Sequence, residues 1–162
     1  NSHATQGIMN VPVLGLVQAG NPIEGIENAN KHIPFPYKET KAEKDLFALS
    51  IDGYSMLNAG FLPGDYVLVE AVNDARNGDI IVASLGSQVT VKRFALKGSH
   101  LYKQSIENLR NSSADSSQAI ANLLPPAMLI PENPDFDPIP FGANEDDRVV
   151  GVVRALYRSE IN

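Results

Sequence analysis

Short runs of hydrophobic residues recur along the chain, several of them alternating with polar positions. Glycine, proline, asparagine and aspartate separate these runs, a pattern typical of short strands joined by turns. Two short stretches, Met56–Gly60 and Ser116–Leu124, suit a helix instead. The pattern predicts an all-β fold, mainly antiparallel, with one or two short helices. The expected strands are Val11–Val17, Asp45–Ile51, Tyr66–Glu70, Asp79–Ala83, Gln88–Phe94 and Arg148–Tyr157.

The last of these segments differs from the others because it is almost continuously apolar from Val149 to Tyr157. A run of this kind is typical of a strand that is buried on both of its faces. We therefore expect the strand to be buried on both faces, and an interface between two copies of the chain could supply that burial.

The segment Gln88–Phe94 carries the first candidate for chemistry. Its alternation places Thr90, Lys92 and Phe94 on one face of a strand. If that face points inward, burial disfavours the charged ammonium form and lowers the pKa of Lys92. A lysine amine that has lost its proton is a general base.

The segment Ile51–Met56 carries the second candidate, because Gly53 permits a sharp turn that exposes Ser55. A serine hydroxyl is a weak nucleophile, so a base within hydrogen-bond reach must take its proton; serine and lysine form such pairs. The backbone N–H groups of Ser55 and Met56 are candidates for an oxyanion hole. We expect the Met56 side chain to fill a substrate or core pocket.

Both residues also have ordinary interpretations. Ser55 could cap a helix, and Lys92 could be a surface lysine whose aliphatic stem lies along Phe94. No single spacing distinguishes these alternatives from a catalytic pair.

An ordered set of motifs closely resembles the C-terminal self-cleaving domain of the LexA repressor family, which includes UmuD polymerase subunits and phage repressors. The resemblance runs from Val11 to Tyr157, apart from one insertion, and implies a LexA/signal-peptidase-like β fold. The motifs are Gly53–Met56, Pro63–Asp65, Asn77–Asp79, Val89–Arg93, Pro131–Pro134 and Val150–Arg154.

The resemblance also implies a function for individual residues. Ser55 matches the family's nucleophile and Lys92 its base. Ala19 and Gly20 fall where the family's scissile bond lies, and Val17 precedes them in the expected substrate pocket. Small side chains at this bond let the backbone approach a nucleophile closely. Leu16 and Asn21 depart from the residues usual in the family, which leaves the rate and its regulation open.

The function implied is self-cleavage of a transcriptional repressor of the DNA-damage response. The implied partners are a second copy of the chain and the RecA–single-stranded DNA filament that triggers the cut; no cofactor or metal is expected. Val11–Gly15 and Leu129–Pro134 look more like LexA than UmuD. A polymerase subunit activated by the same cut is the alternative within the family. A non-catalytic β domain that only dimerises is the alternative outside it.

Domain organisation follows from the same motifs. Residues 1–10 look like a cloning remnant and linker, and residues 11–162 form the peptidase domain, with the cleavage-site region at 11–44. The insertion, at about residues 98–127, is rich in Ser, Asn and Ala and is expected to be a mobile, solvated loop with a short helix near Ser116–Leu124. Pro131–Pro134 is interpreted as an extended edge without chemistry.

Composition narrows the classes of function. The 162 residues suit one domain, and with no cysteine the chain has neither disulfides nor thiolate metal sites, which fits a cytoplasmic protein. A net charge of -6 argues against direct nucleic-acid binding, so DNA contact would need an upstream domain. No apolar run approaches the roughly 20 residues that span a bilayer, so no membrane association is expected.

Overall fold

The computed structural model describes residues 8–15, 22–27, 29–36 and 45–159. Among these residues the structure is mostly β, with a few short helices, as the sequence predicts. The strands are β1 (Met9–Leu14), β2 (His32–Phe35), β3 (Leu46–Ser50), β4 (Tyr66–Glu70), β5 (Ile80–Leu85), β6 (Val89–Leu96), β7 (Ala127–Ile130), β8 (Ile139–Phe141) and β9 (Asp147–Tyr157). The helices are α1 (Pro22–Glu27), the 3-10 turn η3 (Leu57–Ala59), α2 (His100–Arg110) and α3 (Asp115–Leu123).

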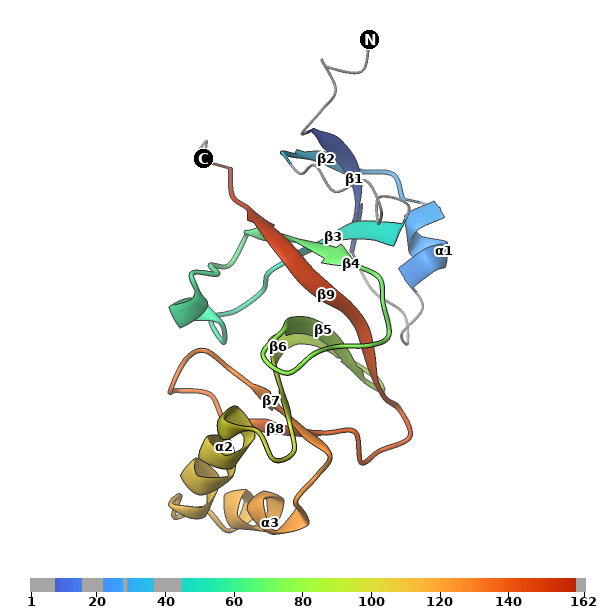
Figure 1. Cartoon of the computed structure of the whole chain (residues 1–162). Coiled ribbons are helices and arrows are strands. Elements are labelled where there is room, and N and C mark those ends of the chain that lie inside the picture. Colours follow the sequence, from blue (N-terminus) through green and yellow to red (C-terminus); the bar gives the residue numbers. More distant parts are fainter. Residues whose placement is uncertain (1–7, 16–21, 28, 37–44, 160–162) are drawn as a thin grey trace.

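One mixed sheet connects the described strands in the order β2-β1-β3-β4-β9-β5-β6-β7-β8. The pair β1 and β3 is parallel, and the other pairs are antiparallel. The long strand β9 crosses the middle of the molecule, with β4 on one side and β5 on the other (Figure 1). It therefore joins the half of the sheet that contains β3, the strand that leads into the Ser55 turn, to the half that carries Lys92.

Within a single chain, β9 is buried on both faces only at its middle. Val150, Gly151 and Val152 are buried between β4 and β5 of the same chain. Beyond them exposure alternates, and Leu156 is 38% exposed. The apolar run thus reflects the central place of the strand in the sheet, and burial at its middle needs no second copy of the chain.

The insertion also differs from the expected solvated loop. The short helix near Ser116–Leu124 is present as α3, but a second helix, α2, precedes it. Tyr102, Ile106 and Leu109 of α2 are buried in a small apolar cluster with α3 and with residues of β6 and β7. Their spacing of four and three residues is helical. Because most of the residues between them are polar, the sequence was interpreted as a loop and this helical spacing was missed.

Candidate active site

A cleft of about 610 Å³ opens between the end of β3 and the hairpin of β5 and β6. Residues 49–53, Ser55 and Met56 line one side, and residues 86–92 line the other. Ser55 and Lys92, which are 37 positions apart in the sequence, thus share one cavity. Gly15, directly after β1, also lines it.

Bending of the sheet accounts for two distant strands lining one cleft. Three strands, β4, β9 and β5, separate β3 from β6. In a flat sheet, four steps of about 4.8 Å would hold the two strands roughly 19 Å apart. The register shifts in the two ladders of β9, at Leu68/Val69 and at Val82/Ala83, are irregularities that increase twist and bending. The residues after β3 then complete the approach to β6.

Lys92 is 7% exposed and lies in an apolar row of the sheet. It is directly opposite Ile81 on β5, and Ile81 is opposite Val152 on β9. Burial disfavours the ammonium form and lowers the pKa of Lys92 below its ordinary value. The lysine Nζ donates a hydrogen bond to the Thr90 hydroxyl. No carboxylate among the described residues forms an ion pair with it, so no described ion pair offsets the desolvation.

Ser55 lies in a short, anchored turn. Gly53 has φ of +93°, which a residue with a side chain rarely adopts, and it redirects the chain after β3. Met56, which follows the serine, is buried in the main core and lines the cleft. Ser55 itself is half-buried. The backbone N–H groups of Ser55 and Met56 donate no hydrogen bond within the described part of the chain, so both remain available to an oxyanion.

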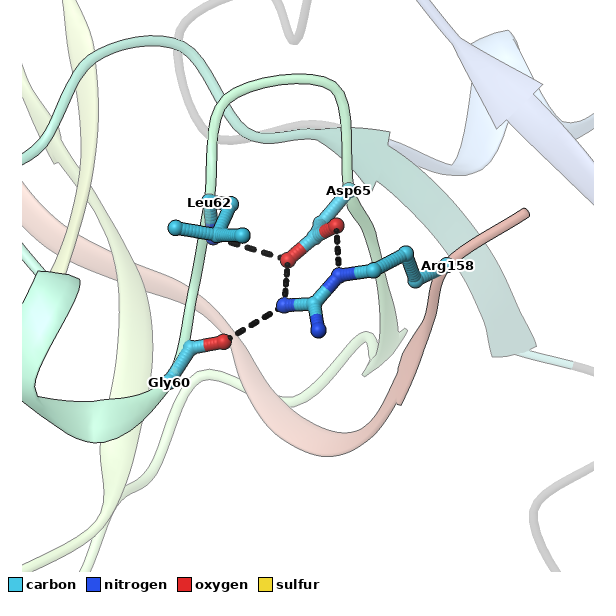
Figure 2. A network of polar contacts seen from close by, with 4 residues as sticks. All are labelled: Gly60, Leu62, Asp65 and Arg158. Carbon is cyan, nitrogen blue, oxygen red and sulfur yellow. Dashed lines mark hydrogen bonds and ion pairs between the residues drawn. The ribbon is translucent and has the colours of Figure 1, made fainter. Parts of the chain in front are cut away.

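The turn that follows the serine is held by Arg158, the residue directly after β9. Figure 2 shows the guanidinium of Arg158 against the carboxylate of Asp65, with two N–H···O contacts of 2.7 Å, and a third bond of 2.8 Å to the carbonyl of Gly60. The hydrogen bond from Arg158 lowers the pKa of Asp65, against the opposing effect of burial. The carboxylate also accepts from the N–H of Leu62. This network fixes the chain just beyond η3.

A second set of contacts, from the segment Pro131–Pro134, holds the serine turn from the other side. The N–H of Glu132 donates to the carbonyl of Ser55 at 2.8 Å, and its carbonyl accepts from the N–H of Asn58 at 2.7 Å. The side-chain amide of Asn133 donates to the carbonyl of Tyr54 at 2.9 Å. The sequence interpretation gave this segment no function. The signals in the sequence were the cluster of prolines, which indicates rigidity, and the place of this segment among the family's ordered motifs.

The other predicted site residues, Val17, Ala19 and Gly20, lie outside the described residues. Gly15 lines the cleft, and Ala19 follows it by four residues. Four residues span at most about 14 Å when fully extended. The bond between Ala19 and Gly20 is therefore tethered close to the cleft, whatever path the chain takes.

The described part of the chain contains no group of three or more His, Asp or Glu side chains placed to hold a metal ion. None of the helices described is long and apolar enough to cross a membrane.

Comparison with known proteins assigns the chain to a family. The profile of the family described as Peptidase S24-like matches residues 12–118, which include Ser55 and Lys92. The chain belongs to this family. It is 43% identical over 97 residues to the LexA repressor of Clostridium botulinum (strain Langeland), an alignment that covers 60% of this chain and 48% of the relative.

Two further relatives align over almost the whole chain. The LexA repressor of Clostridium novyi is 35% identical over 153 residues, covering 93% of this chain and 61% of that protein. The LexA repressor of Carboxydothermus hydrogenoformans is 36% identical over 155 residues, covering 96% and 63%. The chain thus spans about half to two thirds of the length of these relatives. It is a LexA-type S24 peptidase domain.

Proposed function

We propose that this domain is a serine peptidase that cuts its own Ala19–Gly20 bond, with Ser55 as nucleophile and Lys92 as general base. The observation that carries the proposal is that Ser55 and Lys92 line one cleft, where Lys92 is buried and unpaired with any described carboxylate. A lysine in this environment is poised to lose its proton, which is the state that a base requires.

The reaction follows from these positions. The neutral amine of Lys92 accepts the proton of the Ser55 hydroxyl as Oγ attacks the carbonyl carbon of Ala19. The N–H groups of Ser55 and Met56 are available to stabilise the resulting oxyanion. The C–N bond to Gly20 then breaks, and the Lys92 ammonium gives its proton to the leaving amine. Water hydrolyses the ester on Ser55, with Lys92 again as the base and the serine recovering its proton.

The biological setting is inferred from the similar proteins, which are named LexA repressors. In this proposal self-cleavage inactivates a transcriptional repressor of the DNA-damage response, and RecA filaments on single-stranded DNA stimulate it. The domain forms a homodimer, and DNA binding belongs to a part of the protein outside residues 1–162.

The test is incubation of the purified chain between pH 7 and pH 10, followed by mass spectrometry. Cleavage should accelerate with pH because the unprotonated fraction of Lys92 grows. The acceleration should end below the pH at which an ordinary lysine titrates, since burial lowers this pKa. The half-life should not depend on protein concentration, because substrate and nucleophile share one chain.

Substitutions test the proposed role of each residue in the reaction. Ser55→Ala and Lys92→Ala should each abolish the cut while the fold persists, and Gly20→Glu should block it by crowding the approach to Ser55. A cut that persisted in pure Ser55→Ala protein, or one mapped to another bond, would refute the assignment. A wild-type chain that stayed intact at every pH and with RecA filaments would favour the non-catalytic alternative.

A further inference from the structure

We infer that Glu132 is a positioning residue, which holds the Ser55 turn at a fixed distance from the strand that carries Lys92. The inference rests on the proposed function, and it concerns a residue that touches neither reacting side chain. Glu132 is the one residue among those described that contacts both the turn of Ser55 and a neighbour of Lys92 in the hydrogen-bond network.

The main chain of Glu132 makes the first half of this connection. Its N–H and its carbonyl bind Ser55 and Asn58 at 2.8 and 2.7 Å, on either side of Met56. The turn itself has few internal bonds, among them those from Leu57 N–H to the carbonyl of Tyr54 and from Ala59 N–H to the carbonyl of Met56, each 3.1 Å. The bonds to Glu132 connect two points of the turn, at Ser55 and Asn58, to the segment that follows β7.

The side chain of Glu132 makes the second half of the connection, to the strand that carries Lys92. Its Oε2 accepts from Nε of Arg93 at 2.8 Å, and both side chains are 28% exposed. Arg93 directly follows Lys92, and its Nη1 also donates to the carbonyl of Gly78 at 2.7 Å. The guanidinium is thus fixed from two sides. An ion pair that is partly buried and geometrically constrained resists screening better than a fully exposed pair.

The register of the sheet explains why Glu132 can reach both groups. Strand β7 pairs with β6, and Ile130 lies directly opposite Arg93. Two residues later the chain has left the ladder at Glu132 and meets the Ser55 turn. A closed path results, from Lys92 to Arg93 along the chain, across the ion pair to Glu132, and through its N–H to Ser55.

This path matters because proton transfer between Ser55 and Lys92 requires an approach of about 2.6–3.2 Å. A misplacement of about 1 Å in a catalytic group can lower a rate by about 100-fold. Loss of the Glu132 side chain removes the cross-link to β6 but leaves the main-chain bonds. It should therefore lower the fraction of molecules in the reactive arrangement without altering the amine, whose pKa is set by burial.

The experiment compares self-cleavage of the full chain in three variants. Glu132→Ala should slow the cut by about 10- to 100-fold, by the same factor at each pH from 7 to 10, and at the same bond. Glu132→Gln keeps an oxygen that accepts from Arg93 and should recover most of the rate. Glu70→Ala is the matched control, because Glu70 pairs with Arg154 at 2.8 Å, outside the residues that line the cleft. It should cleave within about twofold of wild type.

Amide hydrogen exchange gives a readout that does not depend on cleavage. In a Ser55→Ala background, Glu132→Ala should increase exchange of residues 54–60, whereas Glu70→Ala should not. Equal exchange in the two variants would overturn the inference even if the wild-type chain proved inactive. Cleavage of Glu132→Ala at the wild-type rate, with Ser55→Ala inactive, would overturn it and leave the proposed function standing.

Discussion

Gly151 occupies a position in β9 where any side chain would collide with β4. A Cβ atom placed on it would lie 2.4 Å from Cγ1 of Val69 and 2.6 Å from the carbonyl oxygen of Glu70. Its φ is outside the left-handed region, so the constraint on this glycine is space and not backbone conformation. Gly151→Ala therefore tests the packing of the central strand directly.

The residues around Gly151 determine how much stability Gly151→Ala should cost. Val69 is fully buried in the main core, so its methyl group has no open space to enter. The carbonyl of Glu70 belongs to the backbone of β4, which pairs with β9 at Val152. Adding atoms to a packed core costs about 1–3 kcal/mol, and movement of backbone favours the upper part of that range. For a chain of this size, about 3 kcal/mol corresponds to a decrease in Tm of roughly 6–12 °C.

Thermal and urea unfolding, followed by circular dichroism in the Ser55→Ala background, would measure the change without interference from cleavage. Gly15→Ala is the matched control, because a Cβ there meets no atom of the described residues within 4 Å. The double variant Val69→Ala/Gly151→Ala should be more stable than the sum of the single effects predicts, since Val69→Ala removes the colliding methyl. A decrease in Tm of less than about 2 °C for Gly151→Ala would refute the reasoning.

Two further substitutions should change the stability of the fold in a predictable direction. Lys92→Met should abolish cleavage yet raise the Tm at pH 7, because it removes a buried charge whose desolvation lowers the pKa. Between the pKa of Lys92 in the folded chain and its ordinary value, the unfolded chain binds more protons, so the stability of a chain that keeps Lys92 rises with pH. The difference in Tm between Lys92→Met and Ser55→Ala should therefore shrink toward pH 10. A difference in Tm that grew with pH would contradict this argument. Leu124 ends α3 with φ of 47° and is 43% exposed, so Leu124→Gly should stabilise the domain by up to about 1 kcal/mol in urea unfolding, and a loss of stability would contradict the strain argument.

Much of the strand pattern was predictable because it depends on local sequence. The expected hairpin at Leu85–Ser87 is present, and Gly86 has φ of 96° at the first central position of the turn. A primed turn with glycine in this position matches the twist of paired strands. Lys92 and Phe94 are both buried, as their shared face predicts. Alternation and turn chemistry were sufficient for these conclusions.

The placement of Ser55 and Lys92 in one cleft could not be derived from local pattern. It depends on the order of strands, in which β9, from the far end of the chain, separates β4 from β5. Nothing in the residues near Ser55 specifies that neighbour. The ordered motifs predicted the pair only through their resemblance to a family. Similarly, the contacts of Glu132 depend on the register of β7 against β6, which no short-range signal reports.

The short length of chain between Gly15 and Ala19 has a kinetic consequence for the proposed reaction. Because Gly15 lines the cleft and Ala19 is four residues away, the scissile bond remains within about 14 Å of it. At so short a tether, finding the nucleophile is not a slow step. Slow cleavage at neutral pH would then reflect two other factors: the protonated fraction of Lys92 and the fraction of chains with the bond seated against Ser55. The pH profile reports the first factor. A partner that accelerates the cut at fixed pH, without shifting that profile, must therefore act on the second.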